Sequence, residues 1–315
     1  MKNSVFVIMI AASLTLSACR HKNHFEVDLP RDEQSQKYPG SPIGYLGNDL
    51  SWEDIADVKS SITHLKYFVT GAGVKEEREF ASPQEASEWM LPLPAGEYDV
   101  LVAANMNKAN GFSLSETAPT RAVALSLPTV YSYLDNPSFN PKQAWSGIAH
   151  VSVAADAMTT VHLDLDRLLA LFTLKVKNFP EGNTIDVSIR NAADYVTLTA
   201  LRAGGRYGLP SDKISADISL GHLTFANAQS EINEFKVFPT ATGIEKTMLI
   251  FHIVTSEGIH LDYEGEAPAM ENGKKYVLEL DYNTLTPYMY ITSTSINDWT
   301  DAWSFNGEVL NPQAN

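Results

Sequence analysis

The sequence predicts an all-β protein in which short strands alternate with turns. Apolar and polar residues alternate with a period of two in segments such as 184–190, where Ile185, Val187 and Ile189 share one face. Clusters rich in glycine and asparagine, such as residues 181–183, separate these segments and are typical of turns. Many short strands at this spacing favour β-sandwiches over helical folds.

The first 18 residues predict a signal peptide. Lys2 is their only charge, residues 5–16 are almost wholly apolar, and the small residues Ser17 and Ala18 follow. A basic start, a short apolar core and a small-residue cleavage site are the layout of a secretory signal. The core is too short to span a bilayer, which takes about 20 apolar residues. No later segment comes close to that length, so the sequence predicts no transmembrane helix.

The only cysteine of the chain, Cys19, follows this signal directly. The order Leu16-Ser17-Ala18-Cys19 resembles the bacterial lipobox, which implies cleavage between Ala18 and Cys19 and attachment of diacylglycerol and palmitate to Cys19. Two or more acyl chains anchor a protein stably, whereas one does so only marginally. The alternative is an ordinary secretory leader in which Cys19 has no role. In either case the mature chain has no intramolecular disulfide and no thiolate zinc site.

The bulk composition favours a folded, acidic protein. Hydrophobic residues make up 44% of the 315 residues, which is enough to form cores. The formal net charge is −15 and no basic stripe is present. This argues against a nucleic-acid partner, because phosphate neutralisation needs clustered Lys and Arg. The length suggests about two domains.

Residues 19–42 are polar and marked by proline, which predicts a linker between the lipid and the first folded domain. His21 and His24 lie here and could hold a metal, but a solvated linker is the favoured interpretation. Beyond it, residues 64–71 predict a strand, and the turn Pro94-Ala95-Gly96 precedes another. Residues 51–61 and 82–90 predict short helices, since each begins at a serine cap with an acidic residue near the first turn.

Further strands are expected throughout the second half of the chain. They are predicted at residues 151–153, 160–166, 170–177, 184–190, 234–240, 247–255, 258–265, 274–283 and 288–298. The domain boundary is placed between about residues 155 and 167. This gives an N-terminal β-sandwich at 43–160 and a C-terminal β-sandwich at 161–315, each of ordinary domain size.

No sequence motif predicts catalysis. The chain has no Gly-x-Ser-x-Gly elbow, no His-Glu-x-x-His and no phosphate-cradling glycine loop. Its 38 carboxylates neither support nor exclude a glycosidase pair. We therefore predict a protein that is not an enzyme, and name no catalytic residue.

Two histidine-containing groups are candidate metal ligands. On a strand, His162, Asp164 and Asp166 would share one face and could hold a cation, although a solvent-facing strand is the favoured interpretation. His252 and His260 flank the turn at 256–258 and could be cross-strand neighbours. Half-buried strand histidines are the more common case, so we predict no metal and no cofactor beyond the lipid.

The tail of the chain is rich in aromatic residues. Exposed aromatics can stack on sugars, but in β-proteins they more often fill cores or cap sandwich ends. The residues concerned are Tyr288, Tyr290, Trp299 and Trp303.

Three segments together resemble the fimbrillin-like proteins of Bacteroides-type bacteria. Residues 93–106, LPAGEYDVLVAANM, are similar to a Leu-Pro-x-Gly-x-Tyr-x-Val segment of their N-terminal domain. Residues 163–178, LDLDRLLALFTLKVKN, are similar to the start of their C-terminal domain, and residues 291–310 to their closing strand. With the lipobox, the resemblance covers the chain end to end.

The resemblance implies two tandem transthyretin-like β-sandwiches in a lipid-anchored subunit of a surface fimbria, a type V pilus. Such a subunit would sit at the outer membrane, serve adhesion, and bind other fimbrial subunits by β-strand addition. Arg31 and Arg78 are candidate sites for Arg-directed proteolytic maturation, whereas an anchor subunit would keep its lipid. Two alternatives stay open: an outer-membrane lipoprotein that binds glycans for an uptake system, and a lipoprotein hydrolase.

Overall fold

The computed structural model describes residues 37–38, 41–49, 61–117, 126–136, 140–225, 229–282, 293–298 and 302–305. Strands dominate these residues, which confirms the all-β prediction, and the named helical elements among them are α3 (Pro83–Ser87) and the 3-10 turn η1 (Lys108–Asn110). The chain divides into two compact units, Met1–Pro39 and Gly40–Asn315, and all named elements belong to the second. Within the described part, no helix has the length and apolarity needed to cross a membrane.

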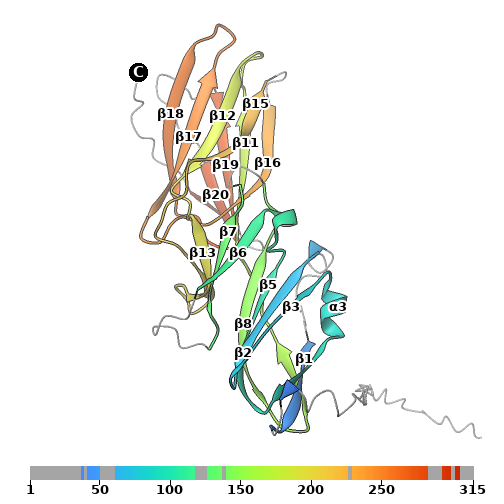
Figure 1. The fold of residues 1–315 in the computed structure, drawn as a ribbon. Helices are drawn as coiled ribbons and strands as arrows, with labels where there is room; N and C mark the ends of the chain where they lie inside the picture. Colours follow the sequence, from blue (N-terminus) through green and yellow to red (C-terminus); the bar gives the residue numbers. More distant parts are fainter. Residues whose placement is uncertain are drawn as a thin grey trace, which may run out of the picture. The chain divides into compact units, whose positions relative to one another are not determined.

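The first half of the second unit builds two sheets, of which Figure 1 labels β1, β2, β3, β5 and β8. The larger is antiparallel, with the order β10-β8-β5-β2-β3. Its strands are β2 (Leu65–Gly71), β3 (Val74–Phe80), β5 (Gly96–Ala104), β8 (Trp145–Val153) and β10 (Asp166–Arg167). The smaller has the order β4-β1-β9, in which β1 runs parallel to β9. Its strands are β1 (Ile43–Asp49), β4 (Met90–Pro94) and β9 (Met158–His162).

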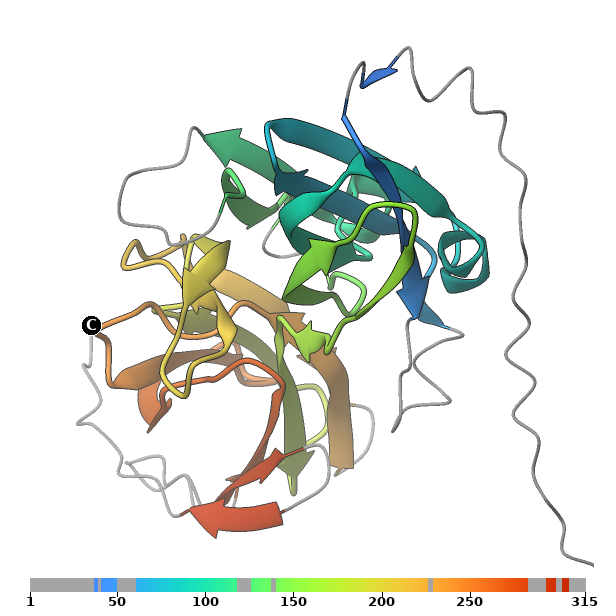
Figure 2. The same ribbon diagram turned by 90° about the horizontal axis from the view of Figure 1, so that it is seen from below.

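Helix α3 confirms the helix that was predicted at 82–90. Ser82 caps its N-terminus by accepting a hydrogen bond from the Glu85 N–H, and Glu85 in turn accepts one from the Ala81 N–H. The helix packs beside β1 and β3, as Figure 2 shows from below. Of the other predicted helix, at 51–61, all but the last residue lies outside the described residues.

A four-stranded antiparallel sheet of order β14-β13-β7-β6 joins strands from both halves of the chain. Its members are β6 (Phe112–Thr117), β7 (Thr129–Leu134), β13 (Tyr195–Leu201) and β14 (Tyr207–Pro210). The core that packs against this sheet also contains residues from both halves of the chain: Phe68, Leu101 and Phe112 from the first, and Val196 and Phe238 from the second. The division at about residue 160 stays a prediction, but strands from both sides of it share this sheet.

Two further sheets enclose the largest core of the described residues. One has the order β15-β12-β17-β18 and the other β16-β11-β19-β20-β21. Their strands are β11 (Ala170–Lys177), β12 (Thr184–Arg190), β15 (Ile218–Thr224), β16 (Gln229–Val237), β17 (Lys246–Val254), β18 (His260–Pro268), β19 (Lys274–Asp281), β20 (Ser293–Asp298) and β21 (Ala302–Phe305). Ile185 and Phe251 of the first sheet meet Phe172 and Leu278 of the second in this core.

The expected strands are mostly present. Strand β11 spans the predicted residues 170–177, and β12 buries Ile185, Val187 and Ile189 fully, as their alternation predicts. The prediction of a single strand at residues 160–166 is wrong. The chain leaves β9 after His162 and enters another sheet as β10 at Asp166, and Leu163 is buried between the two strands.

A buried carboxylate, Asp99, ties three segments of the N-terminal sheet together. Its Oδ1 lies 2.9 Å from His150 Nδ1 on β8, and its Oδ2 accepts hydrogen bonds from the Ser126 N–H at 2.6 Å and hydroxyl at 2.7 Å. Burial by itself would raise the pKa of Asp99, but the hydrogen bonds from His150 and Ser126 outweigh it and hold that pKa below its usual range. The hydrogen bond to Asp99 raises the pKa of His150 in turn.

These shifts predict a pH window for the Asp99–His150 contact. The depressed pKa of Asp99 makes its contribution to stability present above about pH 4 and lost as the pH falls through the folded value. The raised pKa of His150 makes its contribution complete below about pH 6.5 and lost as the pH rises through the folded value. We expect wild type to exceed His150→Ala in thermal midpoint most between about pH 4 and 6.5. Denaturation measured from pH 3 to 9 checks this, and a constant difference would contradict it.

Candidate interaction surface

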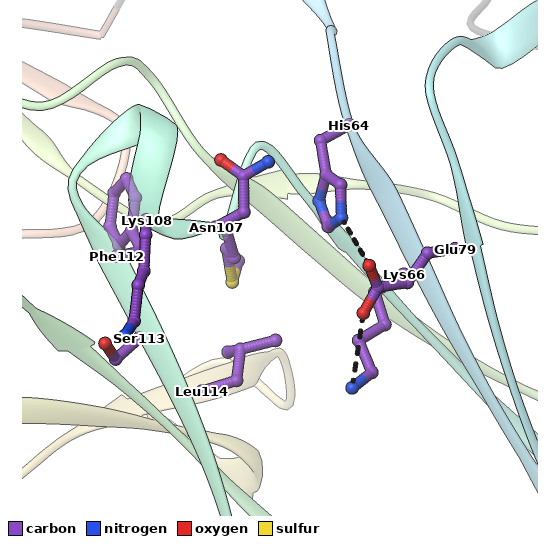
Figure 3. Close-up of a pocket in the computed structure, with 9 residues that line it drawn as sticks. His64, Lys66, Glu79, Asn107, Lys108, Phe112, Ser113 and Leu114 are labelled. Carbon is purple, nitrogen blue, oxygen red and sulfur yellow. Dashed lines mark hydrogen bonds and ion pairs between the residues drawn. The ribbon is translucent and has the colours of Figure 1, made fainter.

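A shallow pocket lies beside the turn from β5 to β6 (Figure 3). Its volume is about 250 Å³, and its walls come from β2, β3, η1 and β6 together with flanking residues. The lining residues are His64, Lys66, Glu79, Met106, Asn107, Lys108, Phe112, Ser113 and Leu114.

Local hydrogen bonds explain why the chain turns at this pocket. Asn107 caps η1 by accepting from the Asn110 N–H at 3.1 Å, and Gly111 ends it in the left-handed region at φ 91°. The buried Asn105 accepts from the Thr63 N–H at 2.8 Å and donates to the carbonyls of Ser61 and Gln143 at 3.0 Å each. Asn105 thereby fixes the segment that leads into His64.

Three of the four titratable side chains that line the pocket, His64, Lys66 and Glu79, pair with one another. Glu79 lies 3.3 Å from His64 Nε2 and 3.6 Å from Lys66 Nζ, as the dashed lines in Figure 3 mark, and Lys66 also lies 3.2 Å from Glu77. The only hydroxyl in the lining, that of Ser113, donates to Asp135 rather than to a histidine. The arrangement therefore has no activated nucleophile, and it suits shallow binding better than chemistry.

Three tyrosines form a second surface feature, which we call the tyrosine platform: Tyr131, Tyr133 and Tyr195. Tyr133 and Tyr195 are register partners on β7 and β13, with ring centroids 5.3 Å apart, and Tyr131 meets Tyr195 edge to face, also at 5.3 Å. All three are half-buried. Burial and the neighbouring phenols raise the pKa of Tyr133.

The platform lies on the side of its sheet opposite to the core. Alternate residues Val130, Val196 and Leu198 are fully buried on the inner side. Ser113 and Ser115 of β6 are the register partners of Tyr133 and Tyr131, so hydroxyl groups border the rings. A rigid aromatic surface with hydroxyl neighbours offers both apolar contact and hydrogen bonds to a ligand.

The structure separates one of the histidine groups considered from the sequence and brings the other together. Asp166 pairs with Arg206 at 2.6 Å and Arg202 at 3.5 Å instead of joining His162 and Asp164. His252 and His260 do lie side by side, with Nε2 of the first 3.2 Å from Nδ1 of the second. Within the described ranges, no group of three or more His, Cys, Asp or Glu side chains is arranged to hold a metal ion.

Several predicted site residues lie outside the described residues. These are Ala18, Cys19, His21, His24, Arg31, Tyr288, Tyr290 and Trp299, while Trp303 falls in β21. Arg78 is described: it is exposed on β3, opposite Tyr67 of β2. β3 lies at an edge of its sheet as described.

Sequence reasoning missed the tyrosine platform. The spacing of Tyr131 and Tyr133 on a predicted strand would have placed them on one face. Nothing local pointed to Tyr195, which lies more than 60 residues further along the chain and reaches them only through the pairing of β13 with β7.

Solved structures show the same fold at low sequence identity. The fimbrial anchor protein Mfa2 from Porphyromonas gingivalis aligns with a TM-score of 0.53 and 11% identity, over 84% of this chain and 98% of that protein. A candidate polysaccharide-binding protein from Bacteroides thetaiotaomicron aligns at 0.52 and 10%, over 83% and 96%. A candidate adhesin from the same species aligns at 0.50 and 11%, over 85% and 99%. These likenesses show the fold alone.

Comparison by sequence gives the family. No curated protein matches the chain closely by sequence. The profile of the fimbrillin-A associated anchor proteins Mfa1 and Mfa2 matches residues 66–303, which is well over half of the 315 residues. The matched range takes in the tyrosine platform, the pocket lining except His64, and most of the described strands. The chain therefore belongs to the Mfa2 family of fimbrillin-A associated anchor proteins.

Proposed function

We propose that this chain is a lipid-anchored subunit of a surface fimbria, held in the outer membrane by acyl chains on Cys19. The family match over residues 66–303 is the observation that carries the proposal, since this is a family of fimbrial anchor proteins and not of enzymes. The lipobox at Leu16–Cys19 supplies the anchor. The linker 19–42 would reach about 80 Å if fully extended, which is ample to hold the folded part above the membrane.

The anchor role is favoured over a proteolytically matured stalk role by the position of Arg78. A cut there would detach β2, whose Leu65, Tyr67 and Phe68 are buried in the core. Losing side chains of this size costs several kcal/mol each. Arg31 precedes every described strand, so a cut at that residue would remove none of them. We therefore propose Arg31 as the maturation site in any subunit form that is processed, with uncut chains serving as anchors.

We propose that other fimbrial subunits bind by β-strand addition to a pair of tandem transthyretin-like β-sandwiches. The support is the open form of the sheets, each of which ends in an edge strand within the described residues. On β3 the edge carries Lys75, Glu76, Glu77, Arg78 and Glu79, charges that oppose pairing with a further strand. The last described strand, β21, has four residues and, among the described residues, pairs with β20 at the end of its sheet.

A second candidate function is glycan binding, and the tyrosine platform is the observation that favours it. Half-exposed tyrosine rings can pack against the apolar face of a sugar while neighbouring hydroxyls bond its polar groups. The structural likeness to a candidate polysaccharide-binding protein agrees with this use. The platform occupies a sheet face rather than an edge, so glycan binding and subunit assembly can be tested separately.

The lipid anchor predicts incorporation of radiolabelled palmitate into the wild-type chain and none into Cys19→Ser, because no other cysteine exists. Cell fractionation should move the variant out of the outer membrane. N-terminal sequencing of the surface protein separates the two roles: a blocked Cys19 indicates an anchor, and a free end after Arg31 indicates processing. Equal palmitate labelling of wild type and variant would remove the anchor proposal.

Strand addition predicts SDS-resistant ladders after surface extraction, and β21 as the exchanging element can be tested with a disulfide. Ser295 and Ser304 are register partners on β20 and β21, so Ser295→Cys/Ser304→Cys should lock β21 in place when oxidised. We expect the ladders to disappear on oxidation and to return on reduction. The control lock Ile250→Cys/Glu264→Cys, between β17 and β18, should leave them unchanged. Absence of ladders in wild type would contradict polymerisation.

Glycan binding predicts that wild type retains one or more members of a polysaccharide panel. Tyr133→Ala and Tyr195→Ala should each weaken that binding by about 2–12-fold, because stacking on one ring contributes on the order of 0.5–1.5 kcal/mol. Tyr207→Ala, on the neighbouring strand β14 and outside the platform, is the matched control. Unchanged binding in both platform variants, or none in wild type, would reject this second function.

A further inference from the structure

A row of alternating histidine and aspartate side chains crosses the outer face of the sheet β15-β12-β17-β18. His222, Asp186, His252 and Asp262 lie one on each strand, and each is a register partner of the next. All four side chains are between 39% and 55% exposed, so solutes can reach them. The residues next to Asp186 and His252 along their strands point into the core: Ile185, Val187, Phe251 and Ile253. Because side chains alternate between the two faces of a strand, the row lies on the outer face of the sheet.

His260 extends this row into an imidazole pair. It lies two residues before Asp262 on β18, hence on the same face, and its Nδ1 is 3.2 Å from His252 Nε2. The ring centroids are 5.3 Å apart. A short hairpin turn sets this approach: the Thr255 N–H donates to the Ile259 carbonyl at 2.9 Å, and the Gly258 N–H donates to the Thr255 carbonyl at 2.9 Å.

Asp262 orients the ring of His252. Its Oδ1 lies 2.5 Å from His252 Nδ1. Since a carboxylate accepts, Nδ1 carries the proton of the neutral ring and Nε2 keeps its lone pair, which is directed at His260. A carboxylate that fixes the tautomer of a histidine in this way is the usual partner of histidines that bind metal ions.

We propose that His252 Nε2 and His260 Nδ1 form a two-ligand site for a divalent transition-metal cation, with Zn²⁺ as the reference ion. Two nitrogens bound to one tetrahedral zinc at 2.0–2.1 Å lie about 3.3–3.4 Å apart. The nitrogens are already at 3.2 Å, close to that spacing. His260 Nδ1 donates to His252 Nε2 in the free protein, so binding of the cation moves this proton to His260 Nε2 or releases it to solvent. Nitrogen donors suit Zn²⁺, Cu²⁺ and Ni²⁺ better than Ca²⁺ or Mg²⁺.

Two protein ligands make this an open, exchangeable site. Water, or a donor group from a second molecule, completes the coordination of the cation. Such a site differs from the closed four-ligand sites that hold structural zinc. It is also separate from Cys19 and from the tyrosine platform. His260 and Asp262 stand on the edge strand β18, but the site uses side chains of the outer face and not the backbone groups that strand addition pairs, so it does not depend on the proposed function.

The test is titration of the full chain, purified in detergent, with ZnCl₂ by isothermal calorimetry. His21→Ala/His24→Ala serves as the background, which removes the linker histidines as a competing site. We expect one saturable zinc equivalent with micromolar affinity. His252→Ala and His260→Ala should each lower that affinity at least tenfold, and Asp262→Asn should lower it by about 10–100-fold.

His222→Ala is the matched control. His222 Nδ1 lies 2.7 Å from Asp186 as His252 Nδ1 lies close to Asp262, but its Nε2 contacts the Thr224 hydroxyl instead of a second imidazole. The His222→Ala variant should bind zinc with the same affinity as the His21→Ala/His24→Ala background chain. Thermal unfolding in EDTA should give the same midpoint for all variants, which excludes misfolding as the cause of lost binding. Lack of saturable binding in the background chain, or an equal loss in His222→Ala, would overturn the proposal.

Discussion

Period-two alternation along paired strands is the constraint on which the rest of this molecule depends. On β12, Ile185, Val187 and Ile189 are buried while Asp186, Ser188 and Arg190 face outward. A slip of one residue would exchange these two faces, so the register that fills the core also fixes what the surface presents. With no cysteine pair in the sequence, packing and backbone pairing must supply the stability that disulfides provide in many exported domains.

The surface features consist of the outward-facing side chains of strands whose alternate, inward-facing side chains form the cores. The tyrosine platform stands on β7 and β13 because Val130 and Val196 occupy the opposite face. The histidine–aspartate row stands on β12 and β17 for the same reason. Elements that hold a buried face are rigid, and rigid elements position side chains more accurately than loops do. A protein that works by holding partners, as an anchor family does, is well served by such surfaces.

Polar side chains join segments that the sheets alone would leave apart. Asn105 bonds the end of β5 to residues 61, 63 and 143, and Asp99 bonds β5 to Ser126 and His150. Each of these is buried, and each has its polar atoms paired, which is the condition under which a buried polar group stabilises a fold. The pocket beside η1 therefore has fixed walls, and its His64 and Lys66 both pair with Glu79.

Local pattern determined much of this protein. The alternation of β12, the extent of β11, the serine cap of α3 and the turn at Pro94–Gly96 were all readable from the sequence, because each depends on residues within a few positions of one another. The sequence indicated in part that His252 and His260 lie close together, since the turn between them is typical of a hairpin, but it did not give the contact between their rings. Only the tertiary structure decided that Tyr195 joins Tyr131 and Tyr133, that Asp166 pairs with two arginines, and that β13 and β14 share a sheet with β6 and β7. Pairing between distant strands is selected by the fit of whole faces and by the closure of long loops, and neither leaves a signature in the residues of any one strand.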